Sequence, residues 1–434
     1  MRESLARVLT ASTQGRVVEQ WDDAATRIAA ERAQVEAAIA QNPSRHIYGF
    51  TTLYGQLDSR PTESVDQPEL LRAHLVGAPR DVPGEFIALA TYCKIEQLHH
   101  GGSGLHPATY NALTSFEQSS DDATGGWLSS YGSGDVVPAA WWIRAALPPA
   151  TYGNLRQGDL IALLNGSFYS TAFGIAAGLA AVHTLAGFLR RAARLCSYPD
   201  ASRHRGAALL SPDLAAYFAR HRRTVSSESA QLPISLRDAD AYLAPIAIAV
   251  DALGEALEQR LAHSSANPLF TFEYGTVDAE SQSSFLDLPL TLALTNVAQA
   301  LQLAIRASQR FVVHLTAEPD ESSSIVRPLQ PSKVAMAVVE RASLIGGQLP
   351  VQFTGSDSDG VEDVRDLSLL TASTVLDLVA LAHEALAIVD TVSPAPPEDS
   401  EPLDALLALF TDDADLNPVA LFDRFAAMRG PFVR

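Results

Sequence analysis

The chain has 434 residues, of which 47% are hydrophobic and 19% are charged, so it can bury a large core without crosslinks to hold it together. Thirty-one basic and fifty acidic residues give a formal net charge of -19, spread along the sequence rather than gathered in a tail. This balance argues against a surface for nucleic acids or anionic membranes, and it favours a small molecule or a protein as the partner.

Short motifs exclude several further classes of protein. The two cysteines, Cys93 and Cys196, are too few for a disulfide framework and lack the spacing of a zinc site. No phosphate-binding loop and no HExxH motif occurs, so we expect neither a metal nor a nucleotide cofactor. The first residues lack the apolar core and cleavage site of a secretory signal, which predicts a cytoplasmic protein.

Hydrophobic periodicity predicts a mainly α fold, a long-helix bundle preceded by a loop-rich part. We divide the chain into a loop-rich part at 1–160, a central long-helix bundle at 161–392, and a linker with a short C-terminal helix at 393–434. The linker contains the Pro-rich and acidic stretch SPAPPEDSEP at 393–402. Helical periodicity is clearest at 25–40, 84–98, 168–195, 239–262, 286–315, 331–346 and 366–390.

Two uncharged segments are long enough to suggest membrane spans, residues 160–189 and 288–305. The first contains Asn165 and Ser170, and the second contains Asn296 and Gln302. Helices that are apolar on nearly every side but carry a few amides are typical of the centre of a large helical bundle. We therefore expect buried core helices and no membrane partner.

Histidines and glycines follow one another in HHGGSG at 99–104. Adjacent histidines on a helix point in different directions, and no acidic residue lies at ligand spacing. The segment predicts the end of a helix followed by a glycine turn.

The stretch SSYGSGDVVP at 129–138 places a serine between two glycines. A nucleophile elbow would need GxSxG, but the residue two before Ser133 is Tyr131, so the hydrolase interpretation is weak. Taken locally, the segment favours a Gly-rich turn in which Asp135 caps a helix that starts near Val136.

Six segments, in order along the chain, carry a resemblance to a known family. They are IYGFTTLYGQL at 47–57, GSGD at 132–135, LLNGS at 163–167, QLPISLR at 231–237, ANPL at 266–269 and GVEDV at 360–364. Together they resemble the histidine and phenylalanine ammonia-lyase family, which includes related aminomutases. The resemblance extends from about residue 45 to 390 and implies an ammonia-lyase-like helix bundle.

The resemblance implies a prosthetic group, methylidene imidazolone (MIO), made from the chain itself. In that family the group forms from an Ala-Ser-Gly tripeptide, whose glycine nitrogen attacks the carbonyl of the first residue while two waters leave. Here Gly132, Ser133 and Gly134 take the three positions. Only main-chain atoms of the first residue enter the ring, so a glycine is chemically acceptable there, and glycines let the chain turn tightly.

The resemblance also assigns roles to the other matching residues. Tyr48 takes the place of the base that removes a proton from the substrate β-carbon, and nearby positive charge must lower its ordinary pKa of about 10 for that work. Arg237 would bind the substrate carboxylate. Asn165 would donate a hydrogen bond to the MIO carbonyl. The remaining polar pocket positions are Gln231 and Glu362.

Some positions depart from the family pattern. Tyr131 replaces a small residue before the tripeptide, and Ile234 replaces a tyrosine implicated in forming MIO. An ungapped alignment places His74 at an asparagine position, and Gln282 with Ser283 at an Asn-Phe pair. Pro79 replaces the histidine of histidine lyases, which predicts a substrate other than histidine.

Three hypotheses follow. The chain is an MIO-dependent ammonia-lyase or aminomutase acting on an unusual α-amino acid in specialised metabolism. Alternatively, it is an MIO-free enzyme that uses Tyr48, Glu362 and Arg237 for acid/base elimination, isomerisation or cyclisation, or it is a non-catalytic subunit of the same fold. The resemblance further implies a homotetramer whose active sites combine residues of more than one subunit.

Overall fold

The computed structural model of the chain describes residues 2–62, 66–77, 80–117, 123–125, 130, 132–198, 211–221, 231–317, 330–347, 349, 362–393, 396 and 399–411. Two of the sequence positions discussed above, Pro79 and Tyr131, lie outside these described residues.

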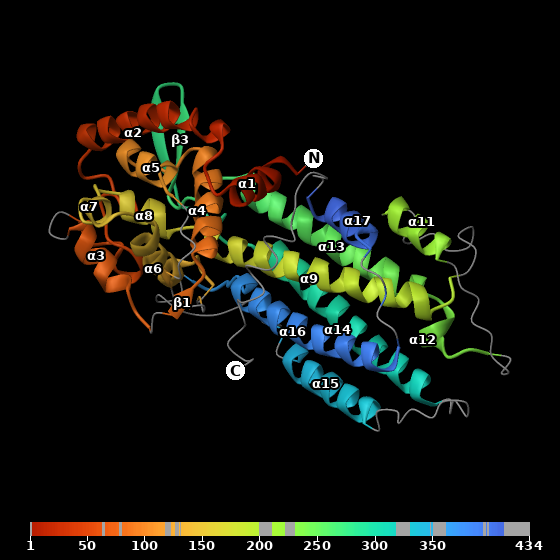
Figure 1. Cartoon of the computed structure of the whole chain (residues 1–434). Coiled ribbons are helices and arrows are strands. Elements are labelled where there is room, and N and C mark those ends of the chain that lie inside the picture. The colour runs from red at the N-terminus through yellow and green to blue at the C-terminus, as the bar shows by residue number, and fades with distance from the viewer. Residues whose placement is uncertain are drawn as a thin grey trace.

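Mostly short helices and turns form the first part of the molecule, at one end of Figure 1. They are α1 (Glu3–Gln14), η1 (Glu19–Trp21), α2 (Ala24–Gln41), η2 (Gly55–Leu57), α3 (Gln67–His74), α4 (Gly84–His99), α5 (Pro107–Thr114), α6 (Val136–Ala146), α7 (Pro149–Tyr152) and α8 (Asp159–Leu164). The helix end predicted from HHGGSG is confirmed, because α4 ends at His99 and Gly101 and Gly102 follow with positive φ.

Long helices lying side by side form the rest of the molecule. They are α9 (Phe168–Leu195), α13 (Asp240–Leu261), α14 (Leu288–Ala317), α15 (Pro331–Gly346) and α16 (Ser368–Val392), with the shorter α11 (Pro212–Arg220), α12 (Ile234–Arg237) and α17 (Glu401–Thr411). Within the bundle α14 packs along α9, α13, α15 and α16. The mainly α fold and all seven periodic segments predicted as helices are confirmed.

Apolar side chains drive the association of these long helices. By length and composition three segments could each cross a membrane: Asp159–Leu195, Leu288–Ala317 and Ser368–Val392. The buried share of their most apolar windows is 94, 61 and 72%, respectively. Their apolar faces therefore meet one another inside the bundle, where burial of apolar surface stabilises the fold.

Two antiparallel pairs of strands provide the strands of the described residues, and one of them is a hairpin. Strand β1 (Arg80–Val82) pairs with β2 (Ala123–Gly125), and β3 (Leu269–Glu273) pairs with β4 (Thr276–Glu280). The β3–β4 turn consists of Tyr274 and Gly275, both with positive φ, as a two-residue hairpin turn requires. In Figure 1 this hairpin lies beside α2, and the Arg45 Nη1 donates to the main-chain oxygen of Val277 at 2.8 Å.

The C-terminal helix α17 packs on α9 and α13. The ring of Phe410, which is fully buried, lies against Gly178 of α9, and its carbonyl oxygen lies against Gly254 of α13. Side chains at either glycine would collide with Phe410. The predicted short terminal helix is therefore present, and it begins at Glu401, inside the stretch predicted as a linker.

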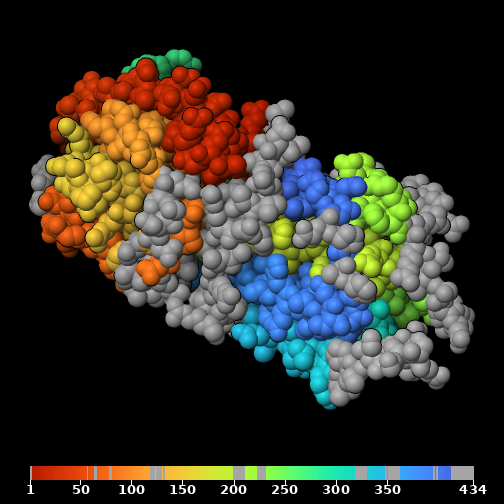
Figure 2. Space-filling model, in the orientation of Figure 1, coloured from red at the N-terminus to blue at the C-terminus, as the bar shows by residue number. Residues whose placement is uncertain are grey.

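The surface repeats the division seen in the ribbon. Figure 2 shows residues of the first part gathered at one end of the molecule and α11, α15, α16 and α17 at the other. Several large apolar side chains on the long helices are nevertheless exposed, among them Ile248 on α13, Leu292 on α14, Leu344 on α15 and Leu370 on α16.

Candidate active site

Gly132, Ser133 and Gly134 form a tight turn directly before α6. Gly132 has φ +100° and Gly134 has φ +90°, a region that residues with a Cβ rarely adopt. The Ser130 hydroxyl joins the two ends of the turn, since it accepts from the Gly132 N–H at 3.1 Å and donates to the Gly134 oxygen at 2.9 Å. The serine between the glycines is half-buried.

The turn is held against the start of α9. The Asp135 N–H donates to the Gly166 oxygen at 2.9 Å. Although Asp135 immediately precedes α6, its side chain makes no cap to that helix, so the predicted cap is wrong. Its carboxylate instead accepts from the N–H of Ser170 at 2.7 Å and the hydroxyl of Ser170 at 2.9 Å. Burial raises the pKa of Asp135 to about 7.

Asn165 ends α8 and lies beside the turn. Its Oδ1 is 3.3 Å from the position that a Cβ on Gly134 would take, and its Nδ2 donates to the Asn267 oxygen at 2.6 Å. The buried Lys94 donates from Nζ to the Asn165 oxygen at 2.9 Å. Burial lowers the pKa of Lys94 to about 7.

Phe285 also lies beside the turn, with its Cδ2 3.7 Å from the same Cβ position on Gly134. The ungapped alignment places Gln282 and Ser283, which are close to Phe285 in sequence, at the Asn-Phe pair of the family. In the structure Gln282 bonds elsewhere, because its Nε2 donates to the Ala266 oxygen and its Oε1 accepts from the Ser284 N–H at 2.8 Å. Gln282 thus stabilises its own loop.

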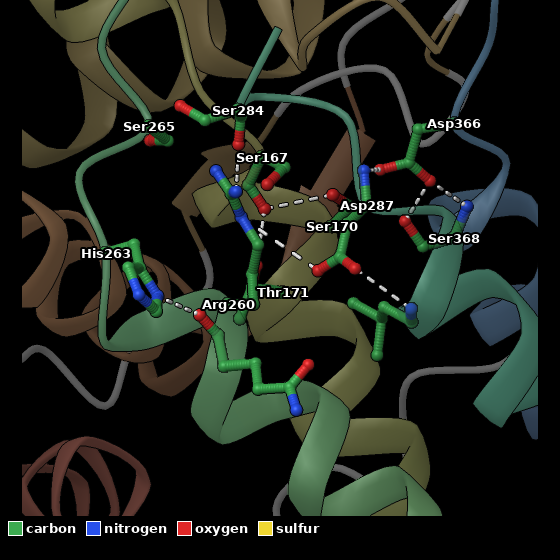
Figure 3. Close-up of polar contacts among 12 residues, drawn as sticks. Ser167, Ser170, Thr171, Arg260, His263, Ser265, Ser284, Asp287, Asp366 and Ser368 are labelled. Carbon is green, nitrogen blue, oxygen red and sulfur yellow. Dashed lines mark hydrogen bonds and ion pairs between the residues drawn. The ribbon is translucent and has the colours of Figure 1, made fainter.

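A cluster of buried charges lies next to the turn, and Figure 3 shows its core. Arg260 Nε lies 4.0 Å from Asp287 Oδ2, and the Asp287 N–H donates to Asp366 Oδ2 at 2.8 Å. Among the described residues Asp287 Oδ2 and two guanidinium nitrogens of Arg260 have no hydrogen-bond partner. Burial raises the pKa of Asp287 to about 6.

A small cavity opens beside the turn. Its lining includes Ser130, Gly132, Asp135, Ser167, Phe285 and Asp366, and its volume is about 110 Å³. Binding pockets for small ligands usually exceed about 300 Å³. The cavity that the described residues line beside the turn is therefore smaller than an ordinary ligand pocket.

Tyr48 lies in the loop between α2 and α3, and this loop packs on α8. Gly49 of the loop contacts Ile161 so closely that a Cβ at Gly49 would overlap with it. The Tyr48 hydroxyl accepts from the Gly55 N–H at 2.9 Å. Burial raises the pKa of Tyr48, and the negative charges of Glu362 and Asp58 raise it further. Glu362 and Tyr48 are thus close enough to interact within one chain.

His74 extends the aromatic surface around Tyr48. Its ring centroid is 5.7 Å from that of Tyr54, which in turn is 6.2 Å from that of Tyr48. The His74 Nδ1 lies 2.7 Å from the Leu70 oxygen.

Arg237 and Gln231 lie at the other end of the bundle. Arg237 is in α12, and the Ser197 N–H just after α9 donates to the Leu236 oxygen at 2.8 Å. Because α9 has 28 residues, these two residues lie about 40 Å from Ser133 in the same chain. The exposed Arg237 Nη2 contacts only its own neighbourhood in the described residues, the Leu232 oxygen at 2.6 Å and Gln231 Oε1 at 3.4 Å.

The structure therefore brings the sequence-predicted residues together in two sets. Tyr48 lies near His74 and Glu362, and Gly132, Ser133 and Gly134 lie beside Asn165. The structure does not bring Arg237 or Gln231 to them within one chain. Among the described residues no group of three or more His, Cys, Asp or Glu side chains could hold a metal ion.

Sequence reasoning missed Lys94, Arg260, Phe285, Asp287 and Asp366. Lys94 carried a usable signal, because it interrupts an apolar run in the segment ATYCKIEQ. Arg260, Asp287 and Asp366 resemble ordinary polar loop and helix-end residues, and Phe285 resembles an ordinary apolar loop residue. Only the fold shows that they are neighbours.

Comparisons with known proteins agree with this architecture. The family model "Aromatic amino acid lyase" matches residues 4–121. No curated protein matches the sequence.

Solved structures resemble the chain over nearly its whole length. Phenylalanine aminomutase from Pantoea agglomerans has 15% identity and a TM-score of 0.67, with 96% of this chain and 91% of that chain covered. Histidine ammonia-lyase from Trypanosoma cruzi has 16% identity and a TM-score of 0.66, with 96% and 94% covered. Ergothionase from Treponema denticola has 14% identity and a TM-score of 0.68, with 98% and 96% covered.

The chain therefore has the helical fold of the ammonia-lyases and aminomutases. The comparisons also confirm the resemblance to the aromatic amino acid lyase and aminomutase family, through the family model at residues 4–121 and the fold over the rest of the chain.

Proposed function

We propose that the chain is an ammonia-lyase or aminomutase that acts on an unusual α-amino acid other than histidine, through a self-formed MIO electrophile. The observation that carries this proposal is the turn at Gly132, Ser133 and Gly134, in a chain with the lyase fold. We place the enzyme in the cytoplasm and in specialised metabolism. One solved neighbour is named an ergothioneine-degrading enzyme, which supports a substrate outside the common aromatic amino acids.

The residues present fit the prosthetic group. The ring takes only main-chain atoms from Gly132, and the positive φ angles at Gly132 and Gly134 give the tight turn that ring closure needs. Asn165 and Phe285 flank Gly134, so a polar amide and an aromatic ring would hold the group on two sides. When formed, MIO supplies an electrophile for the substrate amino group.

The chain's own residues would bind the substrate and move its proton. Tyr48 is the proposed base at the β-carbon, Glu362 beside it would interact with the amino group, and Arg237 would bind the carboxylate through two parallel hydrogen bonds. Arg237 lies about 40 Å from Ser133 along α9. It must therefore come from another copy of the chain.

This distance supports a homotetramer with shared active sites. Ile248, Leu292, Leu344 and Leu370 are exposed on four of the long helices, and apolar groups on a bundle surface are commonly buried by symmetric association. Assembly would also lower the pKa of Tyr48, as its proposed role as a base requires. Within one chain burial and Glu362 raise the pKa of Tyr48, whereas a guanidinium from a neighbouring copy would lower it.

The decisive experiment is the intact mass of the purified chain beside the Ser133→Ala variant. We expect the wild-type chain to be lighter than its sequence by two waters and the variant to have its full sequence mass. A wild-type chain of full mass would exclude MIO.

A full-mass result would direct attention to the two alternatives. An MIO-free acid/base enzyme would keep its activity in Ser133→Ala and lose it in Tyr48→Phe. A non-catalytic subunit would show no turnover, and Tyr48→Phe would change nothing. Light scattering on the purified protein tests the tetramer independently, because a monomer mass would contradict shared sites.

A further inference from the structure

Asp366 contacts the first residue of the Gly132–Ser133–Gly134 turn through main-chain atoms. Its N–H donates to the Gly132 oxygen at 2.6 Å. Its carbonyl oxygen occupies the position that a Cβ on Gly132 would need. The two residues are far apart in sequence, so the start of α16 closes over this turn only in the folded chain.

The main chain of Asp366 is fixed by its own buried carboxylate. Oδ2 accepts from the Asp287 N–H at 2.8 Å, and Oδ1 accepts from the Thr291 hydroxyl at 3.0 Å and the Ser368 N–H at 2.7 Å. The Ser368 hydroxyl also donates to Oδ1. Figure 3 shows Asp366 between Asp287 and Ser368. One carboxylate thus joins the beginnings of α14 and α16.

The contacted oxygen is the one that ring closure must remove. In the proposed cyclisation the Gly134 nitrogen forms a bond to the Gly132 carbonyl carbon, and the carbonyl electron pair moves onto the Gly132 oxygen. That oxygen leaves as water with the hydrogens of the Gly134 and Ser133 nitrogens, while a C=N bond forms between residues 132 and 133. The second water takes the Ser133 hydroxyl and its α-hydrogen, which leaves the methylidene group.

A fixed N–H directed at a developing oxyanion stabilises it, as in acyl transfer enzymes. We infer that the main-chain N–H of Asp366 activates the Gly132 carbonyl for cyclisation, and that the buried Asp366 carboxylate positions this N–H. This inference rests on the proposed MIO function. Asp366 thereby acts on the maturation of the chain, a role separate from any contact with substrate.

The same contact explains why glycine replaces the alanine of the family tripeptide. A methyl group at residue 132 would overlap with the Asp366 oxygen. Either the turn or the start of α16 would have to move, and the hydrogen bond from the Asp366 N–H to the Gly132 oxygen would lengthen. The position of the Asp366 main chain therefore requires a residue without a Cβ at position 132 in this chain.

The test follows the loss of two waters by intact mass in chains isolated at intervals after a pulse of synthesis. Asp366→Ala removes the carboxylate but keeps the N–H, and we expect cyclisation to slow by at least about tenfold. Asp366→Asn keeps one acceptor oxygen and should give an intermediate rate. Gly132→Ala should retain its full mass.

Gly275→Ala is the matched control for Gly132→Ala. Gly275 also has positive φ, +79°, but nothing lies within 4 Å of a Cβ there. It therefore carries the backbone strain without the collision, and we expect it to cyclise at the wild-type rate. Far-UV circular dichroism of each variant records whether the helices have formed.

The outcomes separate this inference from the proposed function. A wild-type chain that never loses two waters contradicts both. A wild-type chain that cyclises, together with Asp366→Ala or Gly132→Ala chains that cyclise at the same rate, overturns the role of Asp366 and leaves the proposed function intact. Should Asp366→Ala fail to fold, a wild-type rate in folded Asp366→Asn chains overturns it equally.

Discussion

The two ends of the helix bundle hold different parts of the proposed chemistry. At the end where α9 and α16 begin, the Tyr48 loop, Asn165 and the turn at Ser133 are held by buried contacts, and the charge of Glu362 raises the pKa of Tyr48. At the other end the exposed Arg237 donates mainly to the main chain beside it. The proposed electrophile and the proposed base thus depend on the fold of one chain, whereas the proposed binding of the carboxylate would depend on how copies of the chain meet.

Mixing two inactive variants would test this division most severely. We expect Tyr48→Phe alone to reduce kcat by ~10²–10⁴-fold, the usual contribution of a positioned acid or base. Arg237→Ala should also be nearly inactive, because it removes the proposed carboxylate-binding group. Co-expressed at equal amounts, the two variants should recover about a quarter of wild-type activity, since that fraction of shared sites combines an intact Tyr48 with an intact Arg237.

The control for mixing is the double variant Tyr48→Phe with Arg237→Ala, co-expressed with Tyr48→Phe. No combination of those two chains contains an intact Tyr48, so activity should not exceed that of Tyr48→Phe. Recovery would be absent from the first mixture as well if both residues served the same site within one chain.

A change in the packing of α17 should affect stability and leave the turn untouched. Phe410 is fully buried against Gly178 and Gly254, so Phe410→Ala should lower the free energy of unfolding by about 3–5 kcal/mol. Urea unfolding measures this loss, with the exposed Gln34→Ala on α2 as a control that should change it by less than about 0.5 kcal/mol. Failure of folded Phe410→Ala to lose two waters would show that the ends are coupled.

The smallest expected effect is a dependence of stability on pH, which arises from Asp135 beside the turn at Ser133. Burial raises the pKa of Asp135 to about 7, so the folded chain holds a proton that the unfolded chain releases near pH 4. Its contribution to stability is complete below about pH 4 and falls as pH rises towards 7, by up to about 1.4 kcal/mol per pH unit. Asp135→Asn, whose amide oxygen can still accept from Ser170, should reduce this slope.

Urea unfolding between pH 4.5 and 7 measures the slope in both chains. Asp287 has a raised pKa of about 6 and contributes in the same direction, so part of the slope should persist in Asp135→Asn. An identical slope in the two chains would contradict the raised pKa of Asp135.

Periodicity in the sequence predicted the long helices to within a few residues, because each has an apolar face. The beginnings of α14 and α16 were predicted two residues too early for a shared reason. Asp287 accepts from the Leu290 N–H at 2.9 Å, and Asp366 accepts from the Ser368 N–H at 2.7 Å. Both carboxylates bond to the first turn of the helix that follows, so regular helix begins only after them.

The candidate site was only partly predictable for a different reason. Tyr48, Ser133 and Asn165 each lie within a short motif of neighbouring residues, which can be identified from the sequence alone. The cluster of Arg260, Asp287 and Asp366 has no such motif, because Arg260 lies in α13, the two aspartates precede α14 and α16, and each alone resembles a solvated charge. The distance of Arg237 from Ser133 likewise depends on the direction of α9, which no local pattern contains.

The uninterrupted length of α9 has a consequence for how this chain tolerates change. Each residue of an α-helix adds 1.5 Å of rise and about 100° of rotation, and α9 runs without a break from the turn at Ser133 to the segment beside α12. One residue inserted in α9 would therefore rotate Arg237 by about 100° about the helix axis relative to Ser133 of the same chain. In the proposed assembly of identical copies that error would recur at every shared site, so the proposal predicts a fixed number of residues in α9 even where its individual side chains are exchangeable.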